Sequence, residues 1–460
     1  MKSIPASSSA IATEQSFALK ENLVTAMLGL TIVLVIMNTM MFNLALPAIS
    51  QQFQLTASST SWIVTGYSIV FAISSITYSR LADFIPIRRL FIIGLLSLGI
   101  AAIIGLFSNG FMMLIMVRLL QASGAGSIPS LSLVLISRYI PLERRGKAMA
   151  LIMSSVSLGL GFGPVAGGAI VQYLGWQLLF AVTAITVLLV PLFFKLIPKE
   201  SAKEGTFDAL GALLIGIGTT GLLLFLTNQS WLALAVGLLT LILFILRIRT
   251  ASHPFVLPAL FHNRSYLILG AVGIAAYLCS FATLYLMPQI LVKQYGLSAI
   301  GAGLVVFPGS ILAILFSRRV GQYIDARGNS SIIRYMPYVL LGSVVLFALF
   351  QGVSYWAILL IYMLLSTSFT ILTSGVSNEM SRLLKPSQLG SGLGLFQLLQ
   401  FFSGAFGVAL SASALIWQSK LTLAQAYSNI YWGLSLVVAV AIVCSIVYSR
   451  LRAASPITGK

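Results

Sequence analysis

The ionisable side chains that could do chemistry are few, and almost all of them lie between long apolar stretches of the chain. Arg118 is the exception, because it lies several residues inside such a stretch, with Gln121 one helical turn further on the same face. Inserting a cation there costs roughly 2.5–3.5 kcal/mol in a membrane. We expect Arg118 either to line an internal pathway and tune a proton or ligand site, or to reach the outer surface and brace helix packing.

Proton chemistry in such a chain needs a group that changes its protonation, usually a buried carboxylate or a histidine. The acids are Glu14, Glu21, Asp83, Glu143, Glu200, Glu204, Asp208, Asp325 and Glu379. Glu379 lies within an apolar stretch, where it either titrates or pairs with Arg382 or Lys385. His253 and His262 share one polar gap, and we expect both to be solvated.

No enzyme signature stands out in the sequence. It has no HExxH, CxxC or GxSxG motif and no glycine-rich phosphate loop, and no histidine lies in an apolar stretch to activate a serine. Cys279 and Cys444 both fall in apolar stretches and are expected to be core residues. We therefore expect no enzyme, no metal and no cofactor. Without an ATP-binding domain, any pumping would use an ion gradient.

The elements that must position these residues are membrane-spanning helices. The chain is 58% hydrophobic and 8% charged, with a mean hydropathy of +1.01, and a soluble protein could not shield so much apolar surface from water. Fourteen apolar runs are long enough to span a membrane, at roughly 20 residues each. They lie near 23–46, 60–79, 90–107, 111–137, 147–172, 175–196, 208–227, 231–249, 266–291, 298–320, 332–351, 354–381, 388–416 and 427–449. The expected fold class is an all-α polytopic membrane protein with 14 transmembrane helices.

Nearly all of the 27 Lys and Arg residues lie in alternate gaps between these runs, and the other gaps hold only Lys293 and Lys420. Because cationic loops stay in the cytoplasm during insertion, we expect both termini to be cytoplasmic in a multi-pass protein of the cell membrane. A net charge of +18 could indicate nucleic-acid binding, but the cations are scattered over short loops and form no basic domain. Membrane lipids are the expected partner, and nucleic acid is not. No cleaved signal peptide is expected.

Two short turns indicate an internal repeat. Residues 79–89 and 321–328 place Asp83 and Asp325, respectively, in a basic turn that ends an apolar run. Equivalent halves divide the chain into an N-terminal segment (1–22), a six-helix half (23–200), a two-helix insert (201–262), a second six-helix half (263–450) and a tail (451–460). Repeated halves of this kind place a substrate site between them, near the membrane midplane.

One expected helix carries a glycine-rich run with a proline. The run contains Gly159, Gly163, Pro164, Gly167 and Gly168. Proline removes a backbone donor and bends a helix, while glycines make a flat face for a close neighbour. The run predicts either a seal or rocking contact between the halves, or ordinary close packing.

Polar and aromatic residues inside the runs are candidates for lining a cavity. They are Asn38, Asn43, Tyr67, Gln121, Tyr285, Gln289, Gln397 and Gln400. Neutral amides and aromatic rings suit a bulky, partly apolar ligand. Asp208, just before an apolar run, is interpreted as a helix N-cap.

Several of these motifs resemble a known family. The 159–168 run is similar to the motif that marks antiporters of the major facilitator superfamily, and Arg118-x2-Gln121-x2-Gly124 resembles its helix-4 motif. The 79–89 turn resembles its helix 2–3 motif. Segments 138–148 and 207–211 resemble fourteen-helix tetracycline exporters. The resemblance implies a major-facilitator-type bundle of six, two and six helices.

The resemblance also implies roles for individual residues. Asp83 would contact neighbouring helix ends and control conformational change, unless it only pairs locally with Arg88 or Arg89. Proton entry would act through Asp83 or Glu379, and Arg118 would tune the cavity. Asn38 departs from the family pattern, because many relatives carry a carboxylate there.

The expected function is secondary active efflux of a hydrophobic drug such as tetracycline, in exchange for protons, by alternating access. An exporter of an endogenous lipid or metabolite without proton coupling is the alternative, and the missing acid in the first helix favours it. A membrane-embedded enzyme or scaffold is a third possibility, but it requires a polar cluster at one face that the sequence does not show. The expected partners are a small hydrophobic substrate, protons and membrane lipids, and we expect a monomer.

Overall fold

The computed structural model describes residues 21–55, 57–202 and 205–454. Most of the expected N-terminal segment and part of the tail lie outside this description, as do Glu14 and Glu204. The described residues form helices and no strand. Fourteen helical segments are long and apolar enough to cross a membrane, which confirms the expected fold class and number of spans.

The first six spans form what we call the N-terminal half. They are α2 (Glu21–Gln52), α3 (Ala57–Leu81), α4 (Ile87–Gly105), α5 (Phe111–Ala125) with α6 (Ser127–Tyr139), α7 (Leu142–Tyr173), and a sixth span made of η1 (Trp176–Leu178), α8 (Leu179–Ala184), η2 (Ile185–Leu189) and α9 (Val190–Leu196). The next two spans, the insert, are α10 (Ala209–Asn228) and α11 (Trp231–Thr250).

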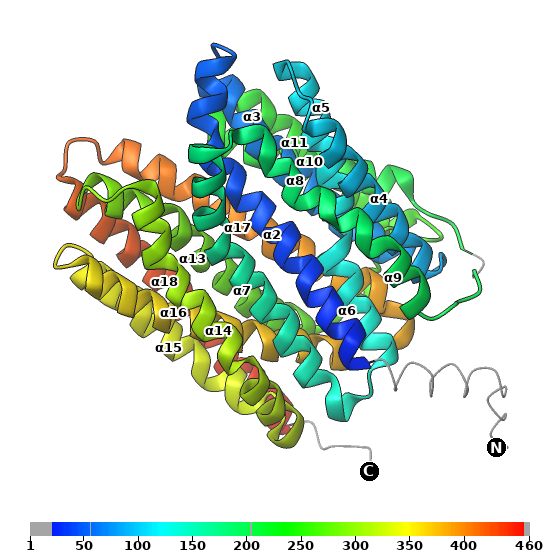
Figure 1. Ribbon diagram of the computed structural model, residues 1–460. Coiled ribbons are helices and arrows are strands. Elements are labelled where there is room, and N and C mark those ends of the chain that lie inside the picture. Colours follow the sequence, from blue (N-terminus) through cyan, green and yellow to red (C-terminus); the bar gives the residue numbers. More distant parts are fainter. Residues whose placement is uncertain (1–20, 56, 203–204, 455–460) are drawn as a thin grey trace, which may run out of the picture.

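The last six spans form the C-terminal half. They are α13 (Arg264–Lys293), α14 (Ala299–Arg327), α15 (Ser330–Phe350), α16 (Tyr355–Leu383), α17 (Leu389–Trp417) and α18 (Leu423–Ala454). A short α12 (Ala259–His262) precedes α13, and η3 (Pro386–Gln388) precedes α17. Figure 1 shows the two halves side by side, with the chain running from blue to red.

Polar residues in the gaps fix where several helices begin. Asp208 accepts a hydrogen bond from the Gly211 amide at 3.0 Å, which confirms it as the N-cap of α10. Ser230, Asn263 and Ser298 cap α11, α13 and α14 in the same way. These caps satisfy amides that the helix itself leaves without an acceptor.

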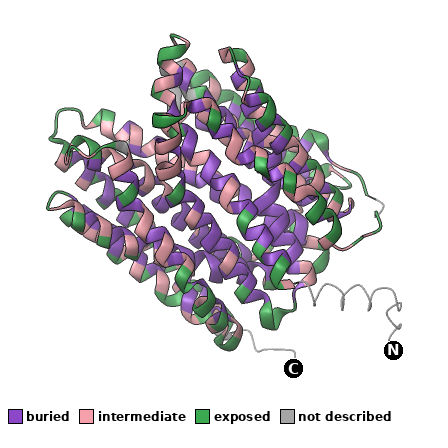
Figure 2. Ribbon diagram, viewed as in Figure 1, coloured by how far each residue is buried: buried purple, intermediate pink, exposed green. Residues whose placement is uncertain are grey.

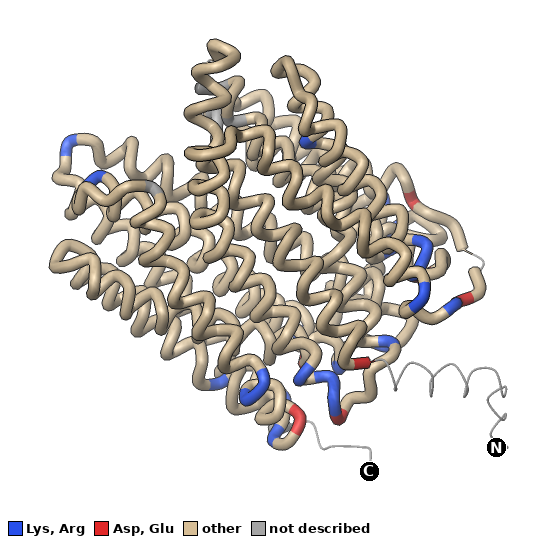
Figure 3. The backbone as a smooth tube through the Cα atoms, in the orientation of Figure 1, with Lys and Arg blue, Asp and Glu red and all other residues tan. Residues whose placement is uncertain are grey.

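Lys and Arg gather at one end of the bundle, where both ends of the described chain also lie (Figure 3). We call this the basic end. Every described acid lies there: Glu21, Asp83, Glu143, Glu200, Asp208, Asp325 and Glu379. Toward the opposite end, the described charged residues are Lys293, Lys420 and, part-way along α5, Arg118.

The two halves meet along one seam. α7 packs against α14 and α16 of the C-terminal half, and α3 packs against α17. α10 contacts both α3 and α17, so the insert covers one side of the seam. α11 lies further out, with only 22% of its span buried inside the protein.

Burial follows the same plan (Figure 2). Buried residues cluster along helices at the seam, such as α7, while the outward faces of the bundle are exposed. Large apolar side chains stand on that outer surface, including Leu188, Trp231 and Leu232. An outer surface of this kind suits lipid and not water.

Candidate functional site

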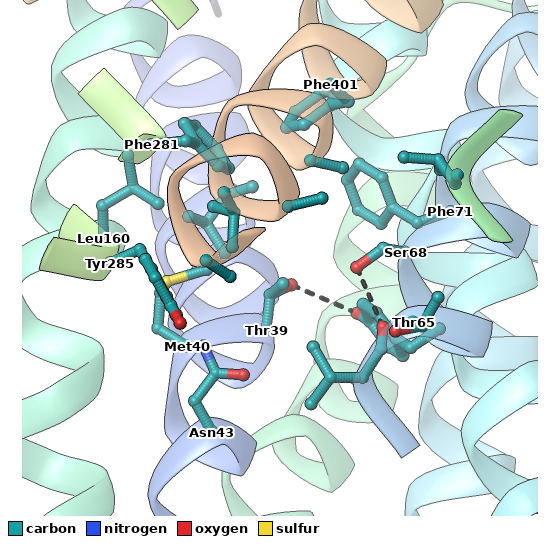
Figure 4. Close-up of a pocket in the computed structure, with 18 of the residues that line it drawn as sticks. Thr39, Met40, Asn43, Thr65, Ser68, Phe71, Leu160, Phe281, Tyr285 and Phe401 are labelled. Carbon is teal, nitrogen blue, oxygen red and sulfur yellow. Dashed lines mark hydrogen bonds between the residues drawn. The ribbon is translucent and has the colours of Figure 1, made fainter. Parts of the chain in front are cut away.

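A cavity of about 380 Å³ lies in the seam, between the middle of the bundle and the opposite end. Its wall comes from α2, α3 and α7 of the N-terminal half, from α13 and α17 of the C-terminal half, and from Leu223 of α10. In Figure 4 the labelled side chains of both halves surround one shared space. This volume is in the range of small-molecule sites.

The cavity wall is mostly apolar and carries no charged side chain among its described residues. Its polar groups are Thr39, Asn43, Thr65, Tyr67, Ser68 and Tyr285. Thr39 and Ser68 donate to carbonyls of their own helices, Thr39 at 3.2 Å and Ser68 at 2.9 Å, so their hydroxyls remain available only as acceptors. Such a wall suits an apolar ligand that makes few directed hydrogen bonds.

Aromatic rings from both halves close the inner side of the cavity. Phe71 of α3 meets Phe401 of α17 edge to face, with ring centroids 4.7 Å apart. Tyr277 of α13 lies 5.6 Å from Phe401 and 5.2 Å from Phe369 of α16. We call these four residues the aromatic floor. Edge-to-face contacts of this kind are favourable yet separable, so the floor closes the cavity without joining the halves permanently.

Arg118 lies beside the cavity, behind Tyr67. Its guanidinium carbon is 3.9 Å from the ring centroids of both Tyr67 and Phe42. One guanidinium nitrogen donates to Asn38 at 2.9 Å and to Gln121 at 2.6 Å. Arg118 is only 1% exposed, so it faces the bundle interior and does not reach the outer surface.

The basic end is closed by hydrogen bonds between the halves. Asp325, near the end of α14, accepts the backbone amide of Gly146 at 2.7 Å and that of Lys147 at 3.1 Å. Both amides belong to the second turn of α7, so this carboxylate ties α14 to the N-terminal part of that helix. Close by, Arg145 donates to Ser381 of α16 at 3.2 Å.

Asp83 makes the corresponding contact from the N-terminal half to the C-terminal half. It lies in the turn after α3, and the backbone of Gly390, in the first turn of α17, hydrogen-bonds to it. Its ion-pair partners are Arg80 at 2.7 Å and Arg138 at 3.6 Å, in place of Arg88 or Arg89. Burial raises the pKa of Asp83 above its usual range, against the lowering effect of Arg80, Arg138 and Gly390.

Glu379 lies in a separate buried cluster within the C-terminal half. It accepts hydrogen bonds from Asn329 at 2.6 Å and from Tyr448 at 2.8 Å, and it pairs with Arg452 at 2.6 Å. The ion-pair partner of Glu379 is therefore Arg452 of α18, and not Arg382 or Lys385 as the local pairing predicted. The cluster joins α15, α16 and α18 at the basic end, away from the cavity wall.

The glycine run of α7 packs against two helices. A Cβ atom on Gly163 would lie 2.7 Å from the Met40 Cβ, and one on Gly167 would lie 2.8 Å from the Met41 Cα, so these glycines let α2 approach closely. Gly159 meets α2 in the same way, whereas Gly168 faces Ile300 of α14. Pro164 lies inside α7 between these contacts. The run thus packs mainly within its own half and touches the seam at one edge.

The other candidate cavity residues are spread more widely. Asn43, Tyr67 and Tyr285 line the cavity, while Asn38 and Gln121 bind Arg118 behind it. The remaining three lie outside the wall: Gln289, Gln397 and Gln400. Gln289 bonds along its own helix to Tyr285 and Lys293, and the other two amides are buried in α17.

Comparison with known proteins decides the family. A model of the Major Facilitator Superfamily matches residues 28–408, which is most of the chain. The chain belongs to the major facilitator superfamily. Its members are transporters, so the expectation that this protein is not an enzyme is confirmed.

Individual relatives are distant. The chain is 30% identical to the riboflavin transporter RibZ of Clostridioides difficile over 63% of its length and 65% of the relative's. It is 27% identical to the probable multidrug resistance protein EmrY of Escherichia coli, over 65% and 61% of the two chains. The crystal structure of the human organic anion transporter MFSD10 has the same fold, with a TM-score of 0.67 at 15% identity, covering 90% of this chain and 98% of that one.

Some residues of the site could not be found from the sequence. The aromatic floor consists of Phe and Tyr residues that look like ordinary packing in an apolar run. The partners of Glu379 come from the start of α15 and from α18, and both segments are about 50 residues or more from Glu379 along the chain. Leu223 joins the cavity wall because α10 covers the seam, which only the packing reveals.

Proposed function

We propose that this protein is a secondary active efflux transporter that works by alternating access. The observation that carries the proposal is a cavity shared by both halves, closed on its basic side by the aromatic floor and by the inter-half contacts of Asp83 and Asp325. Alternating access needs a site between two halves that is closed at one end by contacts able to break. Opening the basic end and closing the other would carry a ligand across.

We also propose the orientation and the division of the chain. The basic end is cytoplasmic, by the excess of Lys and Arg in its short loops, so both termini face the cytoplasm of a cell-membrane protein. The halves are residues 23–200 and 263–450, joined by the insert at 201–262, and the transporter acts as a monomer. In this orientation the described conformation directs its cavity away from the cytoplasm.

The proposed substrate is a small hydrophobic drug, with tetracycline-like compounds as the first choice. The apolar wall with scattered hydroxyl groups and one amide supports this substrate class. Relatives named for riboflavin transport and for multidrug resistance also point to aromatic or apolar compounds of moderate size.

The proposed coupling ion is the proton. Asp83 and Glu379 are largely or fully buried acids at the basic end, and each contacts charged or polar groups, so a change in its protonation would change those contacts. Arg118 tunes the cavity from behind Tyr67. Export of an endogenous lipid or metabolite without proton coupling is the second candidate, and it is favoured by the lack of any acid in the described cavity wall.

Flux measurements separate these candidates. The purified protein is reconstituted into liposomes, and the movement of tetracycline, riboflavin and a fatty acid is followed with and without a pH gradient. The proposal expects drug movement that the gradient accelerates and that a protonophore abolishes, with empty liposomes as the control. Drug flux that does not depend on the pH gradient would contradict proton antiport. Flux of the fatty acid alone would favour the second candidate.

A further inference from the structure

The guanidinium of Arg118 is held only by neutral groups. Its hydrogen-bond acceptors are the side-chain amide oxygens of Asn38 and Gln121, and the rings of Phe42 and Tyr67 lie on it. Gln121 is held in turn, because its amide donates to Thr183 at 2.8 Å. These groups orient the cation but leave its charge uncompensated.

No described acid lies near enough to neutralise this charge. The described acids all lie at the basic end, whereas α5 begins at the opposite end and reaches Arg118 after seven residues. The described ion pairs do not include Arg118. A fully buried cation without a counter-ion is unfavourable, so it favours any negative charge that comes within reach.

The cluster also has unused hydrogen-bond donors. The Nε atom of Arg118 and the side-chain nitrogen of Asn38 are both buried and have no acceptor. Buried donors are normally paired, and a carboxylate or sulfonate oxygen is the kind of acceptor that both lack. Two hydrogen-bond donors without an acceptor thus lie beside a cation without a counter-ion. Together they indicate a preformed anion site that no group of the protein fills.

The cavity is the space from which an anion can approach this cluster. Tyr67 belongs to both, since its ring contacts Arg118 and also lines the cavity beside Thr39 and Asn43. One ring therefore separates the cation from the ligand space. The other described charges toward this end, Lys293 and Lys420, are also positive, so the local field attracts anions and repels cations.

We propose that the transported compound is an amphipathic monoanion, an apolar body with one carboxylate or sulfonate, for which Arg118 supplies the countercharge. The inference rests on the proposed transport function and names its substrate class. The apolar wall accommodates the body of the compound, and the Arg118 cluster draws the charged group to the Tyr67 side. Asn38 is essential to this preference, because a carboxylate at that position would neutralise the cation.

Binding of two matched probes tests the inference. The full chain is placed in nanodiscs of zwitterionic lipid, and the affinities of 8-anilinonaphthalene-1-sulfonate and neutral N-phenyl-1-naphthylamine are compared, with empty nanodiscs correcting for partition. The two probes share one apolar body and differ by the sulfonate. We expect the anion to bind at least about tenfold more tightly. Equal affinities, or tighter binding of the neutral probe, overturn the inference.

Asn38→Asp is the decisive variant, because it sets a carboxylate where an oxygen already lies 2.9 Å from the Arg118 guanidinium. It should abolish the preference for the anion, and the melting temperature should not fall, because the new carboxylate supplies the counter-ion that Arg118 lacks. Asn429→Asp is the matched control, since Asn429 is exposed on α18 toward the same end, and it should keep the preference. A preference that survives Asn38→Asp in a stable protein contradicts the role of Arg118.

Flux of the same two probes through proteoliposomes distinguishes failure of the inference from failure of the proposed function. Transport of the anion in preference to the neutral probe supports both. Transport of the neutral probe with exclusion of the anion keeps the transport function and overturns the anion inference. Tight anion binding with no flux of any compound keeps the anion site and overturns the transport function.

Discussion

The Asp325 carboxylate of the C-terminal half lies 2.7 Å from the backbone nitrogen of Gly146, in the second turn of α7 in the N-terminal half. Asp83 of the N-terminal half makes the reciprocal contact with Gly390, at the start of α17. Each half thus places one aspartate against the backbone near the start of a helix in the other half. The two contacts form a matched pair of latches at the basic end.

Removing one latch should loosen the basic end. Asp325→Ala removes the carboxylate that accepts from the Gly146 and Lys147 amides across the seam, and a charge-assisted hydrogen bond contributes about 1.5–3 kcal/mol. We expect the open basic end to become roughly 10 to 100 times more populated. Ser377, buried in the seam beside Met153, reports this when replaced by cysteine and labelled with a maleimide after Cys279 and Cys444 are changed to alanine.

The matched control for that experiment is Glu143→Gln. Glu143 is an exposed acid in the first turn of α7, and its loss should leave the labelling rate of the cysteine at position 377 unchanged. Equal labelling rates in the Asp325→Ala and parent proteins would show that Asp325 does not hold the basic end closed.

Acid should favour the described conformation through Asp83. Burial raises the pKa of this carboxyl in the described conformation. The neutral form of Asp83 is therefore favoured more in this conformation than in one where the turn is solvated. As the pH falls through that pKa, the closed basic end gains population, and as the pH rises it loses population. The labelling rate at position 377 should therefore fall in acid. It is divided by the rate in Asp83→Asn protein at the same pH, because this ratio cancels the effect of pH on the thiol itself. A ratio that is flat across the acid range contradicts this role.

Larger side chains in the glycine run should destabilise the protein, because α7 packs closely on α2 there. Gly167→Val places a side chain against the backbone of Met41, and overpacking of this kind costs about 1–3 kcal/mol. We expect a lower melting temperature and little transport. Gly342→Ala is the control, because a Cβ there meets nothing within 4 Å, and it should be neutral or slightly stabilising. Equal stability of both variants would refute the packing role of the run.

Glu379→Gln should weaken the pH dependence of flux and leave only the contribution of Asp83. The single amide oxygen can still accept from Asn329 or from Tyr448, but the side chain can neither titrate nor pair with Arg452. Tyr448→Phe removes one hydrogen bond and keeps the carboxylate, so its flux should remain dependent on pH. If Glu379→Gln lowers only the melting temperature and keeps the pH profile of the parent protein, then Glu379 is structural.

The sequence predicts the fold well because membrane helices are encoded locally. Each span needs its own run of apolar residues, and Lys and Arg mark the gaps, so the number of spans needs no knowledge of packing. The N-cap at Asp208 is equally local. The repeated basic turns also predict that Asp83 and Asp325 lie at the same end of the bundle.

The site is harder to predict, because its geometry depends on contacts between distant segments. Arg118 is conspicuous in the sequence, but its position between the rings of Phe42 and Tyr67 depends on how α2, α3 and α5 pack. Gln397 is polar and lies in a span, so the sequence predicts that it lines the cavity, but it is buried outside the cavity wall. Both cases are decided by which helix face meets the seam, and one sequence does not encode that directly.

The most direct test of alternating access is the distance between the halves at the basic end. Spin labels on Leu142→Cys, at the start of α7, and on Ser387→Cys, in η3, report it in protein that lacks the two native cysteines, because both positions are exposed. The account predicts one short distance in acid and a second, longer population when the pH is raised with a transported compound present. A single unchanged distance under all conditions, in protein that still transports, would contradict the account.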